Sequence, residues 1–243
     1  ANSRWAAESI AADYGVPTSH VHIVPQGANL PLGAYREWER SAGVTRPDRI
    51  AKEPLKLVFV GKYWHRKGLD RLLRGLVRAR RSGAKASLRI VGCTRQTVPP
   101  DLRDVADVEW LGVIDKCSEA ARFMSLVSEC HVGCLLSRAE AGGIALREYH
   151  ALGLPVLGTA AGGATDQMIP SASVAVPPTA SDEEVADYLT ILDKDRSRLE
   201  EMRAAAWRLR RTALWEGSVS AVQAFWPHRG SPLSTRESSR KTG

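Results

Sequence analysis

The sequence predicts an α/β protein with a doubly wound parallel sheet, and three observations support this fold class. Short apolar runs rich in β-branched residues alternate with segments of helical periodicity along most of the chain, an order typical of βαβ units. The run LKLVFV at residues 55–60 is almost continuously apolar, as expected for a strand covered by helices on both faces. With 44% hydrophobic and 25% charged residues among 243, the composition is that of a globular protein.

The elements follow in order from these patterns. Strands are predicted at residues 21–24, 55–60, 87–91, 108–111, 131–136 and 155–158. Helices are predicted at residues 69–80, 119–127, 143–152 and 182–192. In the first helix the apolar positions 69, 72, 73, 76 and 77 form one stripe, while the arginines lie on other faces. We therefore expect this helix to cover the sheet and to present a solvated basic face.

Two breaks in the alternation predict the domain organisation. Residues 25–54 contain prolines, glycines and charges with little periodicity, which is typical of a linker between domains. Residues 1–24 would then be the last helix and strand of a preceding domain, and residues 55–226 would form the main domain. Residues 227–243 are polar and basic and are predicted to be a disordered tail.

The charge balance limits the possible partners. The chain carries 34 basic and 27 acidic residues, a formal charge of +7, which favours anionic ligands. Nucleic acid is not the expected partner, because the basic helix at residues 69–81 has no interleaved aromatic residues. No run is long enough to cross a membrane and the start of the chain lacks a secretory leader. The first residue is not Met, which leaves room for a leader or a domain upstream.

Four cysteines occur without a CxxC pair, a usage that fits a reducing cytosol better than a disulfide framework. Cys130 and Cys134 flank His131, so a metal site is one interpretation of this segment. The stretch is largely apolar, and buried thiols are the favoured interpretation.

The loop after the strand at residues 55–60 has the composition of an anion site. Lys62 and Lys67 lie between Gly61 and Gly68 in the segment GKYWHRKGLD. In a parallel sheet, ligands bind beyond the carboxyl ends of the strands, and two lysines on a glycine-assisted backbone would suit a diphosphate. A solvated basic loop is an equal alternative for this segment alone.

A second candidate loop, SRAEAGGIALREYHALG, follows the strand at residues 131–136. Gly142 and Gly143 allow backbone N–H groups to approach a ligand, and the helix that begins near Gly143 directs its positive dipole end there. Glu140 and Glu148 could accept hydrogen bonds from vicinal hydroxyl groups of a sugar. For an isolated pair of glutamates, the alternative of a helix cap at Glu140 and a surface residue at Glu148 is favoured.

Residues 137–156 resemble the E-x7-E motif of the family 4 retaining glycosyltransferases, which have the GT-B fold. The segments FVGKYWHRKGLDRLL, LRIVG, VEWLGVI and GTAAGGATDQMI resemble further motifs of that family in the same order, and VPQGANL resembles the hinge between its two Rossmann-like domains. The resemblance extends over about residues 5–225. Several ordered motifs outweigh the alternative interpretation of the two glutamates.

The resemblance implies a role for each matching residue. Lys62 and Lys67 would bind the donor diphosphate, with the backbone of Gly143 and Ile144 completing that site. Glu140 would contact and orient the transferred sugar as the catalytic residue, and Glu148 would hold the ribose. The family usually has Arg at the position of Lys62 and Phe at the position of Gly142. The change at Gly142 is expected to remove an apolar wall and to leave a flexible loop beside the sugar.

The resemblance also implies the reaction and its partners. A nucleoside-diphosphate sugar would be the donor, a carbohydrate or lipid-linked molecule the acceptor, and no metal or other cofactor would be needed. Most of the acceptor-binding N-terminal domain is expected to be missing, so the chain would be the C-terminal half of a GT-B enzyme or would work with a separate subunit. A non-catalytic nucleotide-sugar-binding or scaffold module is the alternative. A cytoplasmic location is expected, with peripheral contact between the basic helix and an anionic membrane as a further possibility.

Overall fold

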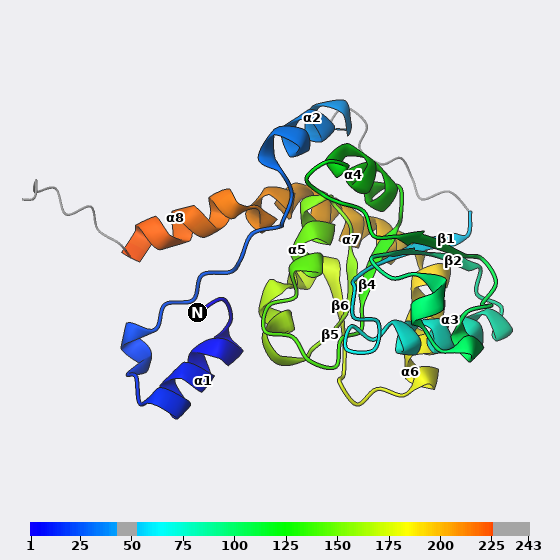
Figure 1. Cartoon of the computed structure of the whole chain (residues 1–243), viewed down its shortest axis with the longest axis horizontal. Helices are drawn as coiled ribbons and strands as arrows, with labels where there is room; N and C mark the ends of the chain where they lie inside the picture. Colours follow the sequence, from blue (N-terminus) through cyan, green and yellow to red (C-terminus); the bar gives the residue numbers. More distant parts are fainter. Residues whose placement is uncertain (43–52, 226–243) are drawn as a thin grey trace, which may run out of the picture.

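The computed structural model describes residues 1–42 and 53–225 and shows one six-stranded parallel sheet flanked by helices (Figure 1). The strand order is β3-β2-β1-β4-β5-β6. The strands are β1 (Leu55–Val60), β2 (Ala86–Val91), β3 (Val108–Gly112), β4 (Val132–Leu135), β5 (Val156–Thr159) and β6 (Ser173–Val176). All five pairings are parallel, so the predicted doubly wound, Rossmann-like α/β fold is confirmed.

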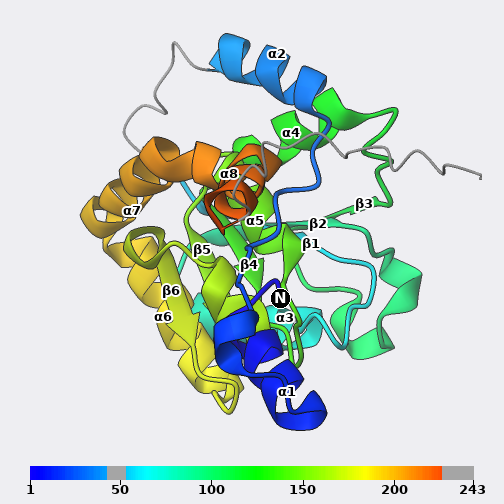
Figure 2. The ribbon, with the colours of Figure 1, turned by 90° about the vertical axis from the view of Figure 1, so that its left-hand side faces the viewer.

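Helices cover both faces of the sheet. The helices of this domain are α3 (Leu69–Arg81), α4 (Ala120–Ser128), α5 (Ile144–Ala151), α6 (Asp182–Lys194), α7 (Arg196–Leu209) and α8 (Trp215–Phe225). In Figure 2, α4 lies above the sheet, and α3 and α6 lie below it. The last two pack closely, because Gly75 of α3 leaves space for the side chain of Val185 of α6. The predicted helices and the predicted strands from residue 55 onwards are confirmed within a few residues at their ends.

The centre of the sheet is held together by Tyr149 of α5. Its ring packs on Gly133 of β4, where an added Cβ would lie only 2.2 Å from the ring. Its hydroxyl oxygen accepts a hydrogen bond from the Val60 N–H (2.7 Å) and donates one to the Cys134 carbonyl (3.3 Å). One fully buried side chain therefore links the ends of β1 and β4 to α5, which keeps the helix in register with both strands.

The thiol groups in β4 and just before it are buried, as the sequence indicates. Cys130 and Cys134 are fully inaccessible, and burial raises the pKa of the Cys130 thiol to about 11. Within residues 1–42 and 53–225, no cluster of His, Cys, Asp or Glu has the arrangement of a metal site.

The prediction of a strand at residues 21–24 is wrong. The segment is extended, but within the described residues it pairs with no strand of the sheet. Its backbone instead exchanges hydrogen bonds with Ala1, whose carbonyl accepts from the Val24 N–H and whose amino group donates to His22, both at 2.8 Å. The preceding helix, α1 (Arg4–Tyr14), forms as predicted and is capped by the Ser3 hydroxyl.

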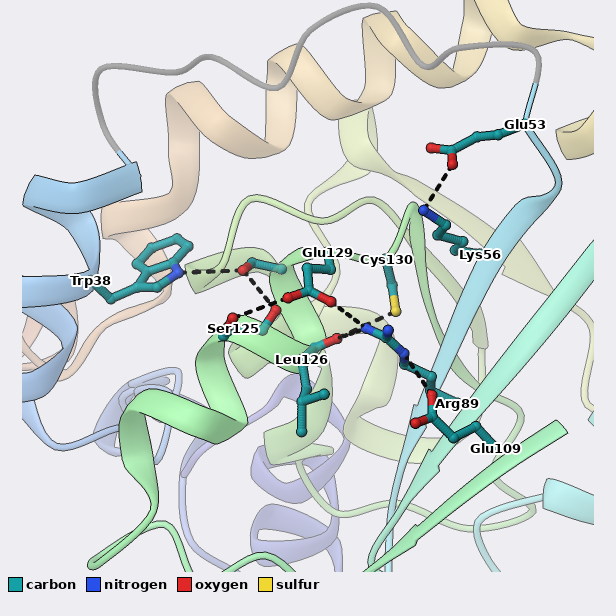
Figure 3. Close-up of polar contacts among 10 residues, drawn as sticks. Trp38, Glu53, Lys56, Arg89, Glu109, Ser125, Leu126, Glu129 and Cys130 are labelled. Atoms are coloured by element: carbon teal, nitrogen blue, oxygen red, sulfur yellow. Dashed lines mark hydrogen bonds and ion pairs between the residues drawn. The ribbon is translucent and has the colours of Figure 1, made fainter.

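Helix α2 (Leu32–Ala42) forms within residues 25–54, the predicted linker, although the sequence there shows little periodicity. The Tyr35 side chain is buried, and its hydroxyl donates to the Ala151 carbonyl at the end of α5 (2.9 Å). The Trp38 indole donates to the Ser128 hydroxyl at the end of α4 (3.3 Å; Figure 3). Packing against α4 and α5 therefore stabilises a helix that has weak periodicity of its own. Residues 43–52 of the predicted linker lie outside the described residues.

Strand β6 and the helices α7 and α8 of the main domain lie outside the strand and helix ranges predicted from the sequence pattern. Strand β6 is short and lies at one edge of the sheet, and α7 follows α6 after a single residue, Asp195, whose carboxylate caps it. Residues 226–243, which include the predicted tail, lie outside the described residues.

An ionic network joins strands β2 and β3 to the end of α4. The Arg89 guanidinium of β2 donates to Glu109 of β3 (2.9 Å) and to Glu129 at the end of α4 (2.8 Å), and also to the Leu126 carbonyl (3.0 Å; Figure 3). The hydrogen bond from Arg89 lowers the pKa of the Glu129 carboxyl. These bonds fix edge strand β3, and with it the loop that leads from β3 towards the candidate site.

Candidate functional site

The candidate site lies at the carboxyl ends of β1 and β4, which are neighbours at the centre of the sheet. From β1 the chain proceeds outward to β2 and β3, and from β4 it proceeds in the opposite direction to β5 and β6. Loops diverge at such a switch point and leave a crevice, which is where parallel α/β sheets bind ligands.

The loop from β1 to α3 is held against the end of β4. Gly68 has φ +72°, and a Cβ there would lie 1.8 Å from the Leu136 carbonyl oxygen, so only glycine allows this close approach. Arg138 donates two 2.8 Å hydrogen bonds to the Asp70 carboxylate at the start of α3. Burial tends to raise the pKa of Asp70, but the bonds from Arg138 outweigh burial and lower it. This clamp fixes the backbone on which Lys67 is carried.

Lys67 and Glu140 meet at the base of this loop. The Lys67 ammonium contacts the Glu140 carboxylate, which also accepts from the Ser137 hydroxyl (2.9 Å) and from Arg66 (3.4 Å). The Glu140 side chain is only 5% exposed. Two residues 73 positions apart in sequence are therefore in direct contact, as a site shared by both loops requires.

Helix α5 directs its N-terminus towards the same loops. It begins after Gly143, which has φ +67° and forms no side-chain cap to the first turn. The Leu146 N–H donates to the Gly143 carbonyl (2.9 Å), whereas the N–H groups of Ile144 and Ala145 could bind an anion, which the helix dipole favours. Ile144, at the first helical position, is 38% exposed and lines the pocket described next.

A pocket of about 200 Å³ lies between these segments. Its walls include Lys62, Lys67, Lys116, Ile144 and Glu148, together with glycines and apolar residues that follow β1, β2 and β3. Four of the predicted site residues therefore line one cavity. Larger hollows also occur: two of about 460 and 430 Å³ lie between α2 and the start of α8, and one of about 490 Å³ lies beside the amino halves of β1, β2 and β3. None of these three contains a predicted site residue.

Glu148 is buried within this pocket. Its side chain is 1% exposed, and Lys116 Nζ lies 2.5 Å from its Oε1 atom. Burial raises the pKa of Glu148, whereas the charges of Lys116 and Lys67 and a hydrogen bond from the Asn29 N–H oppose that rise. The alternative that Glu148 is a surface residue is thus wrong, because the side chain faces inwards from α5.

Arg147, the neighbour of Glu148, extends from the helix towards different segments. It is 7% exposed, and it donates to the Gln26 carbonyl (3.1 Å) and to the Thr212 carbonyl. Burial lowers the pKa of its guanidinium group. The helix that carries Glu148 is therefore attached to residues from both ends of the chain.

Gly142 is not among the pocket residues. A Cβ on Gly142 would lie 1.7 Å from Gln26 Nε2 and 2.9 Å from Asn2 Nδ2. The space beside it is filled by the N-terminal segment, which is anchored there because Ser3 donates to the Ala141 carbonyl (3.1 Å). Gln26 and Asn2, which are distant in sequence, therefore occupy the space that a large side chain at position 142 would need.

The sequence analysis missed two basic residues of the site, Lys116 and Arg66. Lys116 lies four residues after Gly112, the end of β3, so the rule that ligands contact the residues following a strand would have included it. Arg66 is adjacent to Lys67 and donates to the Ala139 carbonyl (3.0 Å).

The arginines of α3 are less solvated than predicted. Arg71 is 7% exposed and donates to the Ala180 carbonyl (2.8 Å). Arg78 pairs with Glu183 at 2.6 Å. Much of the predicted basic face of this helix is therefore engaged in contacts within the domain.

Comparison with known proteins gives one family match and a set of solved structures with the same fold. The family model of glycosyl transferases group 1 matches residues 45–208. No curated protein sequence matches the chain. Among the described residues, no helix has the length and apolarity that a membrane crossing requires.

Solved structures share the fold at low sequence identity. HepE from Anabaena, in complex with UDP-glucose, is 15% identical with a TM-score of 0.65, and the match covers 92% of this chain and 62% of that one. WaaG, a glycosyltransferase involved in lipopolysaccharide biosynthesis, is 19% identical with a TM-score of 0.64 (90% and 60% covered). Sucrose-phosphate synthase from Thermosynechococcus elongatus is 20% identical with a TM-score of 0.61 (90% and 55% covered). The sheet matches the GT-B fold, and this chain spans roughly three fifths of the length of these structures.

Proposed function

The chain belongs to the group 1 glycosyl transferases, and from this premise we propose that it is the donor-binding part of a retaining, family 4 enzyme. It would bind a nucleoside-diphosphate sugar and, with an acceptor-binding domain, transfer the sugar to a carbohydrate or lipid-linked acceptor. The observation that carries the proposal is the pocket at the β1/β4 switch point, where Lys62, Lys67 and Glu148 meet the start of α5. HepE, which shares the fold, binds UDP-glucose.

Each part of the pocket suits one part of such a donor. Lys62 and Lys67 would provide ammonium groups for the diphosphate, and Ile144 brings the N-terminus of α5 to the same pocket, where the backbone N–H groups of Gly143 and Ile144 would complete the phosphate site. The carboxylate of Glu148 can accept hydrogen bonds from the two ribose hydroxyls. The strand ends and Ile114 give an apolar wall for the base.

In the proposed reaction, the bond between the sugar C1 and the diphosphate oxygen breaks while the acceptor hydroxyl forms a new bond to C1 from the same face. The acceptor proton passes to the departing phosphate oxygen. Lysine ammonium groups and the α5 dipole would stabilise the charge that grows on the leaving group, since preorganised dipoles act strongly in a site sheltered from water. Glu140 would orient the sugar, and Lys67 and Ser137 fix its carboxylate for this purpose.

No metal ion has a role in this proposal, because side-chain cations and the helix terminus supply the positive charge. A cytoplasmic location of the protein and its peripheral contact with an anionic membrane remain predictions. Flotation of the protein with acidic and neutral liposomes at physiological salt would test that contact. Protein that stays at the bottom of the gradient with both lipids contradicts it.

Titration calorimetry with UDP-, GDP- and ADP-sugars tests the function. We expect at least one of them to bind the wild-type chain, and K67M to weaken that binding by about tenfold or more, because a charge-assisted bond to phosphate is lost. K85M is the matched control, since Lys85 is exposed in the loop before β2. Absence of binding by the folded chain to all three donors rejects the proposal. Donor binding without transfer by a protein that contains both domains would favour the non-catalytic module.

A further inference from the structure

Lys116 has no role in the donor site as proposed so far, yet it lines the pocket. It comes from the loop between β3 and α4, and its Nζ lies 2.5 Å from Glu148 Oε1. Its side chain is 23% exposed, whereas that of Glu148 is 1% exposed. The lysine thus reaches the pocket from the loop after β3, whereas Lys62 and Lys67 both follow β1.

The position of the Lys116 ammonium is fixed by its surroundings. Nζ lies 4.5 Å from the centre of the Phe123 ring in α4, a cation–π geometry. The neighbouring Asp115 carboxylate accepts hydrogen bonds from the Cys117 N–H (3.0 Å) and the Ser118 hydroxyl (2.8 Å), which shape the turn that carries the lysine. The Lys116 side chain therefore does not need to be ordered by a ligand.

Glu148 requires a nearby cation because burial disfavours its charged form. Burial raises its pKa, and the charge and hydrogen bond of Lys116 are the main opposing influences. Lys67 adds a weaker favourable charge from the loop after β1, and the Asn29 N–H donates from the segment before α2. Tyr149, the next residue on α5, is a buried neutral phenol whose own pKa is raised by burial. Among the groups that favour the charged form of Glu148, Lys116 therefore has the strongest influence.

We infer that Lys116 is a positioning residue of the donor site, which keeps the Glu148 carboxylate ionised and correctly oriented for the ribose hydroxyls of a nucleoside diphosphate. This inference rests on the proposed function of Glu148. Lys116 contacts Oε1, and because a carboxylate has about four lone-pair directions, acceptor sites remain for two vicinal hydroxyl groups. Without Lys116 the carboxyl group would be protonated over a wider pH range and would lose acceptor capacity.

A direct test measures the ionisation of Glu148 without any ligand. In protein labelled with ¹³C at the glutamate side-chain carboxyl, the Glu148 signal is identified by its loss in E148Q, and its chemical shift is followed over pH. We expect K116M to raise the midpoint of this titration by about one to three units, as removal of an adjacent opposite charge does. K116R is expected to restore most of the difference, and K85M to leave the midpoint unchanged. A shift in K116M smaller than about half a unit, well below that range, overturns the inference.

A second test follows ligand binding, with UDP, GDP and ADP as probes and calorimetry between about pH 5.5 and 8.5, a range in which a raised carboxyl pKa can titrate. We expect the affinity of K116M to fall towards acidic pH and to approach that of the wild type towards alkaline pH. An equal loss at every pH would mean that Lys116 contacts the nucleotide directly, which overturns a positioning role. If the wild type binds none of the three, the proposed function fails, and the carboxyl titration still tests Lys116.

Discussion

Acidification should destabilise the protein through two buried histidines. His150 lies on α5, two residues after Glu148, and is fully buried, with Nε2 accepting from the Ile169 N–H (3.1 Å). Burial lowers its pKa to about 3. His131 at the start of β4 is 4% exposed, and burial lowers its pKa to about 4. Both imidazoles are therefore neutral in the folded protein at pH values at which they protonate in the unfolded chain.

The size of this effect follows from the difference in protonation. The ordinary histidine pKa is about 6.5, so the stability associated with neutral His150 and His131 is complete above that pH and is lost as the pH falls towards 4 and then 3. At pH 5, protonation of the unfolded state removes about 2 kcal/mol per histidine, or about 4 kcal/mol for both. That is a large part of the roughly 5–15 kcal/mol by which folded domains are stable.

Urea denaturation at about pH 8 and pH 5, at constant ionic strength, measures this loss. We expect H150N and H131N each to reduce the loss between the two pH values by about 2 kcal/mol, whatever their stability at pH 8. H65N is the matched control, because the His65 ring is exposed in the folded protein. Burial also raises the pKa of Glu148. Its protonation therefore stabilises the folded protein on acidification, but this contribution to the free energy of unfolding is the same in every variant.

The reasoning is refuted if H150N and H131N lose as much stability on acidification as the wild type does. In that case the two imidazoles would be protonated to the same extent in both states, and their burial would not control the acid sensitivity.

Three further predictions concern the fold and the loops of the site. G68A should lower the free energy of unfolding in urea by more than about 2 kcal/mol, because the added methyl group would lie 1.8 Å from the Leu136 carbonyl oxygen. The control is Gly83, which also has positive φ but no atom within 4 Å of an added Cβ. G83A should therefore lower the free energy of unfolding by only about 1 kcal/mol. Y35F should cost about 1 kcal/mol in the same assay, since the phenol loses its bond to an α5 carbonyl; no loss would mean that this bond contributes nothing net. R138M should weaken nucleotide binding in calorimetry by about tenfold because the Lys67 loop loses its clamp, and unchanged affinity would show that the loop is rigid without it.

The parts of the fold that the sequence predicts are those whose pattern is local. The apolar run of β1 and the leucine stripe of α3 report burial directly. The sequence of α2 carries the same information in a weaker form, because Tyr35 and Trp38 stand among charged residues and the helix depends on contacts with α4 and α5. Residues 21–24 have strand propensity, but propensity alone does not form a strand where the sheet offers no adjacent edge.

The candidate site shows the same division. Lys67 and Glu148 could be proposed because each belongs to a motif next to a strand end. Lys116 also follows a strand end, but its contact with Glu148 could not be predicted from sequence, since its orientation depends on the turn formed by Asp115. Gln26 fills the space beside Gly142, although the two residues are more than one hundred positions apart. No local sequence pattern predicts a contact between such distant segments.

The attachment of Arg147 has a practical consequence for anyone who shortens this protein. A version trimmed to begin at β1 would keep the whole sheet and every residue that lines the small pocket. It would also remove the Gln26 carbonyl and leave a buried guanidinium group short of one acceptor, directly beside Glu148. The minimal unit for crystallisation or ligand screening therefore includes the first thirty or so residues, even though they contribute no strand.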